Sequence, residues 1–185
     1  SGVALSWSAA SDSDVTGYRV TRAVGDGSFT ALADVDTGTT SYSDTTAVAG
    51  TTYRYQVLAV LPNDNAQPWS AVADANTPLR AVALSVITAP PTPVEGDDVT
   101  INVVATPADS GTAVAVAEGA TTLGSGVVDA DGKVAIVVHA LAVGAHQLTV
   151  TYAGGATTAQ ATASVTVTIA PAQHQAVATK LTVDP

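Results

Sequence analysis

The fold of this chain is decided at the stretch Asn76-Thr77-Pro78-Leu79-Arg80-Ala81, which separates two different patterns of short strands. In both patterns apolar residues alternate with small or polar ones, and turn residues interrupt them every ~8–12 residues, which is typical of antiparallel β-sandwiches. The 185 residues suit two small sandwiches better than one sandwich of about 100 residues. We therefore predict an all-β chain of two tandem antiparallel β-sandwiches, without significant helix and joined by a short linker.

The first pattern fills residues 1–78. Its predicted strands are residues 3–7, 17–22, 29–32, 40–42, 51–61 and 69–75. The longest of these strands places Tyr53, Tyr55 and Val57 on one face, as expected for a strand that is buried on one side. Asp26-Gly27 provides turn residues between two strands. These features predict one complete domain before the linker.

The second pattern fills residues 79–170. Its predicted strands are residues 82–87, 99–103, 112–117, 123–128, 134–138, 147–152 and 163–169. The run Ala89-Pro90-Pro91-Thr92-Pro93 must be a loop or an extended edge segment, because proline cannot donate to a strand ladder. The turn Asp129-Ala130-Asp131-Gly132 separates two of the strands. We expect a second, independent sandwich.

Four motifs of the first domain carry a family resemblance. They are Leu5-x-Trp7, Asp14-Val15-x-Gly17-Tyr18-x-Val20-x-Arg22, Thr40-x-Tyr42-x-Asp44 and Gly50-x-x-Tyr53-x-Tyr55-x-Val57-x-Ala59. In this order they resemble the fibronectin type III module as bacteria use it, which implies an immunoglobulin-like sandwich. The resemblance implies that Trp7 is the core tryptophan and that the Tyr53 hydroxyl bonds to backbone as a tyrosine corner. The family has one more strand before the tryptophan strand, so we expect that first strand to be missing.

The second domain resembles another family. The motifs are Glu95-Gly96-Asp97-x-Val99-Thr100-x-x-Val103, Asp131-Gly132-x-Val134, Gly144-x-His146-x-Leu148-Thr149-Val150-x-Tyr152-x-Gly154 and Val165-Thr166-Val167. Together they resemble the bacterial immunoglobulin-like repeat of long surface proteins. The resemblance implies the same sandwich class for residues 79–170.

The tail, residues 171–185, contains one more alternating stretch, Ala176–Val183, which echoes Ala81–Val86 at the start of the second domain. Two interpretations remain open. The stretch is the first strand of a further module, or it pairs head to tail with an unpaired strand edge of a neighbouring molecule through residues 176–185.

Charge and composition exclude several classes of partner. The net charge of −10 is shared equally, since residues 1–78 and residues 79–185 each carry 3 basic and 8 acidic residues, or −5. An evenly acidic surface argues against nucleic acid and anionic membranes. No apolar run approaches the ~20 residues of a membrane-spanning helix. Without cysteine there is neither a disulfide nor a thiolate metal site.

No pattern predicts catalytic, cofactor-binding or metal-binding residues, and we expect no cofactor and no enzyme activity. The acidic clusters are Asp12 with Asp14, Glu95 with Asp97 and Asp98, and Asp129 with Asp131. Each is better explained as a turn, because Asp bonds backbone two residues on and calcium needs six to eight oxygens. The histidines are His139, His146 and His174. They lack the spacing of a metal site, and no Gly-x-Ser-x-Gly stretch accompanies them.

Trp69 is the one aromatic residue without an evident core position, and packing in the core or at an edge is favoured over an exposed sugar platform. The resemblances imply non-catalytic spacer or stalk modules of a larger secreted or cell-surface bacterial protein. Such modules position another domain of the same parent protein. The alternative is a carbohydrate- or protein-binding module of an extracellular enzyme or adhesin, with polysaccharide or cell-wall glycan as partner. A polysaccharide-binding test with a Trp69→Ala control separates the two.

Overall fold

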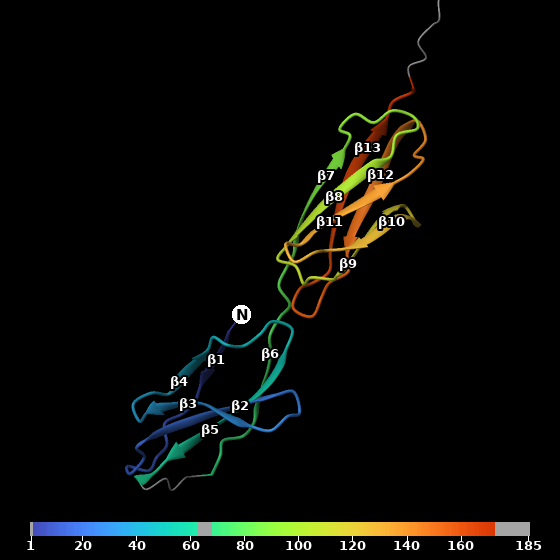
Figure 1. Cartoon of the computed structure of the whole chain (residues 1–185). Coiled ribbons are helices and arrows are strands. Elements are labelled where there is room, and N and C mark those ends of the chain that lie inside the picture. Colours follow the sequence, from blue (N-terminus) through green and yellow to red (C-terminus); the bar gives the residue numbers. More distant parts are fainter. Residues whose placement is uncertain (1, 63–67, 173–185) are drawn as a thin grey trace, which may run out of the picture. The chain divides into compact units, whose positions relative to one another are not determined.

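The computed structural model describes residues 2–62 and 68–172 (Figure 1). In these ranges the chain forms thirteen strands in antiparallel sheets and contains no α-helix. The described residues accordingly include no helix long and apolar enough to cross a membrane. The all-β prediction is confirmed. The chain divides into two compact units, Ser1–Ala81 with Gly154–Ala159, and Val82–Ala153 with Gln160–Pro185.

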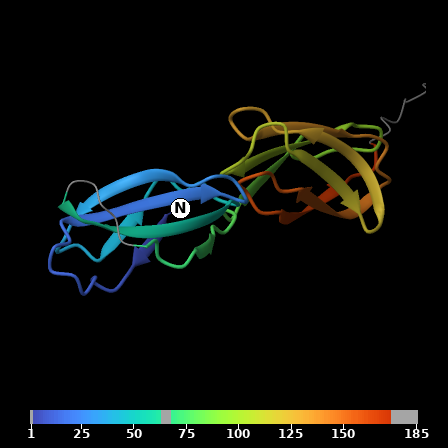
Figure 2. The same ribbon diagram turned by 90° about the horizontal axis from the view of Figure 1, so that it is seen from below.

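The first unit contains two sheets. Its strands are β1 (Val3–Ser6), β2 (Gly17–Val24), β3 (Thr30–Asp36), β4 (Ser41–Asp44), β5 (Thr52–Val60) and β6 (Ala73–Asn76). A two-stranded sheet pairs β1 with β4, and a four-stranded sheet has the order β3-β2-β5-β6. Figures 1 and 2 show these strands as two layers.

The core of this unit is formed by apolar side chains that alternate with polar ones along the longest strands. Along β5 the side chains of Tyr53 and Tyr55 are buried, and Val20 of β2 is fully buried in the register that pairs it with Val57. Successive residues of a strand point to opposite faces, so Tyr53 and Tyr55 of β5 both enter the space between the sheets.

β6 begins later than the sequence indicated. We expected a strand over residues 69–75, but the pairing with β5 begins at Ala73. Before it, the backbone amide of Ser70 donates to the Val57 carbonyl, while the Val57 amide donates to the Ser70 hydroxyl. A side-chain oxygen thus takes the place of a carbonyl in the ladder, and regular pairing cannot extend through Ser70.

The second unit is also a pair of sheets. Its strands are β7 (Ala83–Ala89), β8 (Val99–Thr106), β9 (Ala113–Glu118), β10 (Thr121–Val127), β11 (Lys133–Val138), β12 (Gly144–Tyr152) and β13 (Ala161–Ile169). One sheet has the order β11-β8-β7 and the other the order β10-β9-β12-β13. β7 ends where the proline-rich run begins, since proline cannot continue the ladder.

The core of the second unit is continuous between its two sheets. Val99, Ile101 and Val103 of β8 face Leu148 and Val150 of β12, and all five are essentially inaccessible to solvent. The facing residues are almost entirely aliphatic, so the packing depends on shape rather than on polar contacts.

Candidate functional site

A tyrosine corner closes the first unit. The backbone amide of Val48 donates to the Tyr53 hydroxyl at 3.0 Å, so the hydroxyl holds the segment before β5 against the strand. This confirms the role that the resemblance implied for Tyr53. The second unit repeats the device, because the amide of Asp109 donates to the buried Tyr152 hydroxyl at 3.0 Å. Both tyrosines have structural roles.

Asp44 is a buried carboxylate that the sequence did not reveal as a special residue. Its side chain is 0% exposed. Oδ2 accepts hydrogen bonds from Arg22 Nη1 at 2.7 Å and from the Tyr55 hydroxyl at 2.8 Å. Oδ1 accepts from the Thr46 amide at 2.9 Å and from the Thr46 hydroxyl at 2.6 Å. Both carboxylate oxygens are therefore satisfied, as a buried charge requires.

This environment changes the ionisation of the cluster. Burial alone would raise the pKa of Asp44, but hydrogen bonds from Thr46, Arg22 and Tyr55 outweigh burial and lower the pKa to about 2. Burial and the bond to Asp44 raise the pKa of the Tyr55 hydroxyl well above its usual value. The bond to Asp44 likewise raises the pKa of Arg22, whose guanidinium lies 4.9 Å from the centre of the Tyr53 ring. The cluster is a fixed ion pair inside the sandwich.

Trp7 does not have the fully enclosed position that the resemblance implied. Its side chain is half-buried and makes an edge contact with Tyr18, with ring centroids 5.6 Å apart. The indole Nε1 is buried and has no hydrogen-bond partner among the described residues. The neighbours on the open side, Ser8, Ser11 and Ser70, are too small to cover the ring.

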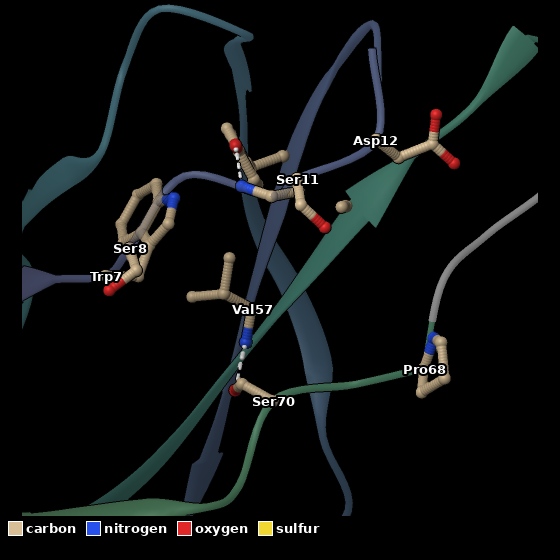
Figure 3. A pocket seen from close by; sticks show the side chains of 10 residues that line it. Trp7, Ser8, Ser11, Asp12, Val57, Pro68 and Ser70 are labelled. Atoms are coloured by element: carbon tan, nitrogen blue, oxygen red, sulfur yellow. Dashed lines mark hydrogen bonds between the residues drawn. The ribbon is translucent and has the colours of Figure 1, made fainter. Parts of the chain in front are cut away.

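A groove of about 450 Å³ opens beside this tryptophan. Trp7, Tyr18 and Val57 give it an apolar floor, and serine hydroxyls together with Asp12 supply the polar lining. Figure 3 shows Trp7 and Ser11 on one side of the groove and Ser70 with Pro68 on the other. Its volume lies within the range of small-molecule sites, about 300–1,000 Å³.

Trp69 lies next to this groove in sequence but does not line it. Trp69 is 45% exposed, so it is not a core residue, and of the two expected positions, core or edge, only packing at an edge fits this exposure. Pro68 and Ser70 both line the groove, and in an extended segment the residue between them points the other way. Trp69 therefore projects outward, where a planar ligand can reach it.

The acidic clusters form turns. The amide of Asp14 donates to Asp12 Oδ1, and the amide of Asp131 donates to Asp129 Oδ1, each at 2.9 Å. These two bonds are the ones that the turn interpretation predicted. Asp97 differs, because its Oδ2 accepts at 2.9 Å from the amide of Val94, three residues before it. Among the described residues no three His, Cys, Asp or Glu side chains gather in a way that could hold a metal ion.

The histidines lie apart from one another. His139 Nδ1 is 2.7 Å from Asp98 Oδ1 on the exposed surface. His146 is largely buried, with Nδ1 at 3.0 Å from Glu118 Oε1 and Nε2 at 2.8 Å from the Ala142 carbonyl. His174 lies outside the described residues. The hydrogen bond to the Ala142 carbonyl, supported by the one to Glu118, raises the pKa of His146 against the opposing effect of burial.

Comparison with known families assigns the second unit. Residues 86–170, which are 85 of the 185 residues, match the model of the bacterial Ig-like domain (group 3). This region is similar to the bacterial immunoglobulin-like domain family. The match confirms the resemblance read from its motifs. No curated protein matches the chain in sequence.

Solved structures show the fold of the whole chain. A segment of two fibronectin type III domains from chicken tenascin is 16% identical, with a TM-score of 0.58, and the match covers 90% of this chain and 92% of that one. The fibronectin(III)-like modules of CbhA from Clostridium thermocellum are 18% identical, with a TM-score of 0.42 and coverage of 95% and 90%. The tenascin likeness, together with the bacterial Ig-like match, confirms the predicted pair of folds.

Both module families are typically non-catalytic. Modules of these kinds are found in bacterial multidomain surface proteins.

The Asp44 cluster and the groove were not predicted from the sequence. The sequence did contain a signal for the Asp44 cluster: in Thr40-x-Tyr42-x-Asp44 the aspartate falls on the same face of the strand as the residues expected in the core. The groove had none, because its walls come from segments far apart in the chain.

Proposed function

We propose that the chain is a pair of spacer modules that positions another domain of a larger secreted or cell-surface bacterial protein. The observation that carries the proposal is the succession of two β-sandwiches, the second of which is similar to the bacterial Ig-like domain family. We place the module boundary as the sequence suggests, with modules at residues 1–78 and 79–170. The partners are then the neighbouring domains of the parent protein.

The start of the linker favours a stiff joint. Thr77 is buried, and its amide donates to the Thr51 carbonyl at 3.0 Å. Its carbonyl accepts from the Gly50 amide at 3.0 Å, and its hydroxyl accepts from the Thr51 amide at 2.9 Å. The chain is thus held to the first sandwich up to Thr77. Pro78 follows with a fixed φ angle, which restricts the next bond as well.

Spin-label distance measurements test the stiffness that a spacer needs. The chain lacks cysteine, so single cysteines at exposed Ala31 on β3 and Thr166 on β13 give one label in each sandwich. We expect a narrow distance distribution that Pro78→Gly broadens. The matched control, Pro91→Gly in an exposed loop, leaves it unchanged. A parent distribution as broad as that of the Pro78→Gly variant contradicts the proposal.

A second function is supported by the groove and by the exposed Trp69. An exposed planar aromatic side chain suits a polysaccharide, whose rings stack on aromatics, and the groove on the other side of the same segment offers serine hydroxyls as polar partners. Retention of the chain on insoluble cell-wall glycan or cellulose, abolished by Trp69→Ala, supports this binding function. Equal retention of the parent chain and the Trp69→Ala variant counts against it.

A further inference from the structure

The outer edge of β1 has no partner strand among residues 2–62 and 68–172, where β1 pairs with β4 alone. A sheet of only two strands is marginal unless something else covers it. The hydrophobic residues on β1, Val3 and Leu5, remain only partly buried although they pack against the core. This side of the sandwich is therefore less complete than the opposite sheet, which has four strands.

The register of β1 against β4 shows which backbone N–H and C=O groups of β1 are free to bond at its outer edge. The amide of Trp7 donates to the Thr40 carbonyl, so Trp7 and Thr40 form a hydrogen-bonded pair. Such pairs alternate along an antiparallel ladder, which makes Leu5 and Tyr42 a bonded pair too. The N–H and C=O groups of Ala4 and Ser6 consequently point away from β4. They provide two donors and two acceptors for another strand.

Nothing in the sequence of β1 protects this edge. Natural edge strands are blunted by charges, prolines or bulges. β1 reads Val-Ala-Leu-Ser, with neither charge nor proline. The two edge strands of the larger sheet in the same unit differ, since β3 carries Asp34 and Asp36, and β6 carries Asp74. The open edge of β1 is suited to accepting a strand.

We propose that this edge binds the tail stretch Ala176–Val183 of a second copy of the chain. The stretch lies outside the described residues, so the argument rests on its sequence. Val177, Leu181 and Val183 fall on one face with Thr179, and the single charge, Lys180, falls on the other. Such a strand offers apolar side chains to Val3 and Leu5 while keeping its lysine in solvent.

The chain itself shows that this kind of sequence forms an edge strand of a sandwich. Ala81–Val86, which Ala176–Val183 echoes, contributes to β7, at the edge of a three-stranded sheet. Val82, Leu84 and Val86 pack against the core there, while the residues between them are exposed. In the aligned tail their places are taken by Val177, Thr179 and Leu181. The contact between tail and β1 is heterologous, so it can propagate from copy to copy.

Light scattering across a concentration series tests the proposal with the full 185-residue chain. We expect the average mass to rise at least twofold with concentration, and to stay at that of the monomer when residues 176–185 are deleted or Leu181 is changed to Asp. Both tail changes lie outside the residues of the two cores, so they should leave both sandwiches folded. Ala4→Pro removes an outward N–H of β1 and should also keep the chain monomeric. Ser43→Pro is the matched control, because Ser43 lies opposite Ala4 on β4 and does not bond to β1. The Ser43→Pro variant should still associate as the concentration rises.

Hydrogen exchange gives a direct readout of the edge. The peptide that covers β1 should become more protected as the concentration of the full chain rises, and this gain should disappear in the Leu181→Asp variant. A chain that stays monomeric at every concentration overturns the proposal. Assembly that survives both the tail deletion and Leu181→Asp overturns it as well.

Discussion

At the scale of single residues, the Asp44 carboxylate accepts hydrogen bonds from four donor groups on three residues of the first sandwich. Arg22 lies on β2, Tyr55 on β5, and Thr46 in the segment that follows β4. Removing the charge while keeping the shape leaves the Arg22 guanidinium, whose side chain is 23% exposed, without its carboxylate partner. The cluster therefore couples the two sheets of this unit, and its loss should be felt throughout the unit.

We predict that Asp44→Asn lowers the free energy of unfolding of the first sandwich by about 3 kcal/mol, because it breaks a buried ion pair on one side. Urea unfolding, followed by the fluorescence of Trp7 and Trp69, which both lie in the first unit, measures the change. Asp34→Asn is the matched control. Asp34 also pairs with an arginine, Arg19 at 2.8 Å, but on the exposed surface, so its loss should cost less than about 1 kcal/mol. Equal effects of the two substitutions would refute the structural role of Asp44.

Asp44 also predicts acid sensitivity of the first unit. Its folded pKa of about 2 lies below the ordinary 3.8, so the folded state favours the ionised form. The resulting stability, about 2 kcal/mol, is present above about pH 4 and is lost as the pH falls toward about 2. Urea unfolding at about pH 5 and about pH 2 measures this loss. The Asp44→Asn variant should show a smaller difference between the two conditions, and an unchanged difference contradicts the assignment.

His146 predicts the opposite pH dependence in the second unit. Both ring nitrogens face oxygen acceptors, Glu118 and the Ala142 carbonyl, so the ring fits best when it is doubly protonated. The raised pKa stabilises the fold below the usual value of 6.5, and the gain is lost as the pH rises through the folded pKa. Unfolding of the chain at about pH 5.5 and about pH 8.5 should show this loss. The His146→Gln variant should show no such loss of stability between the two pH values. The His139→Gln variant, changed at an exposed site, should show the same loss as the parent chain.

At the scale of elements, alternation predicted every strand because each sandwich strand has one face in the core and the other toward solvent. Thirteen predicted stretches correspond to the thirteen strands of the described residues. The late start of β6 was not predictable, because apolar Val72 continues the pattern although it is exposed. What ends the ladder there is one hydroxyl, that of Ser70, which accepts the Val57 amide. Hydrophobic periodicity carries no information about such a bond.

The turn between β10 and β11 requires glycine. Gly132 has φ of +75°, and a Cβ at this position would collide with the Ala105 carbonyl oxygen. We predict that Gly132→Ala destabilises the second sandwich by more than about 1 kcal/mol, through backbone strain and this collision. Gly119→Ala separates the two causes, because its φ of +57° is also positive but no atom lies within 4 Å of the added carbon. Thermal unfolding should show a clearly smaller effect at Gly119.

At the scale of the whole molecule, the first compact unit runs through Ala81, while the module boundary between residues 78 and 79 stays a prediction from the sequence. The assignment of Gly154–Ala159 to this unit was not foreseen. In that assignment the Arg80 amide donates to the Thr157 carbonyl at 3.0 Å, and the Ala159 amide donates to the Arg80 carbonyl at 2.8 Å. These are backbone bonds between residues far apart in sequence, which side-chain patterns do not encode.

The central claim is that the two sandwiches hold neighbouring domains at a defined separation. The most direct test places the chain between a donor and an acceptor fluorescent domain, at concentrations too low for association, and derives the distance distribution from the donor decay. An unstructured Gly/Ser linker of equal length is the control, since such linkers behave as flexible coils. We predict a distribution clearly narrower than that of the linker. A distribution as broad as the linker's would contradict the spacer function.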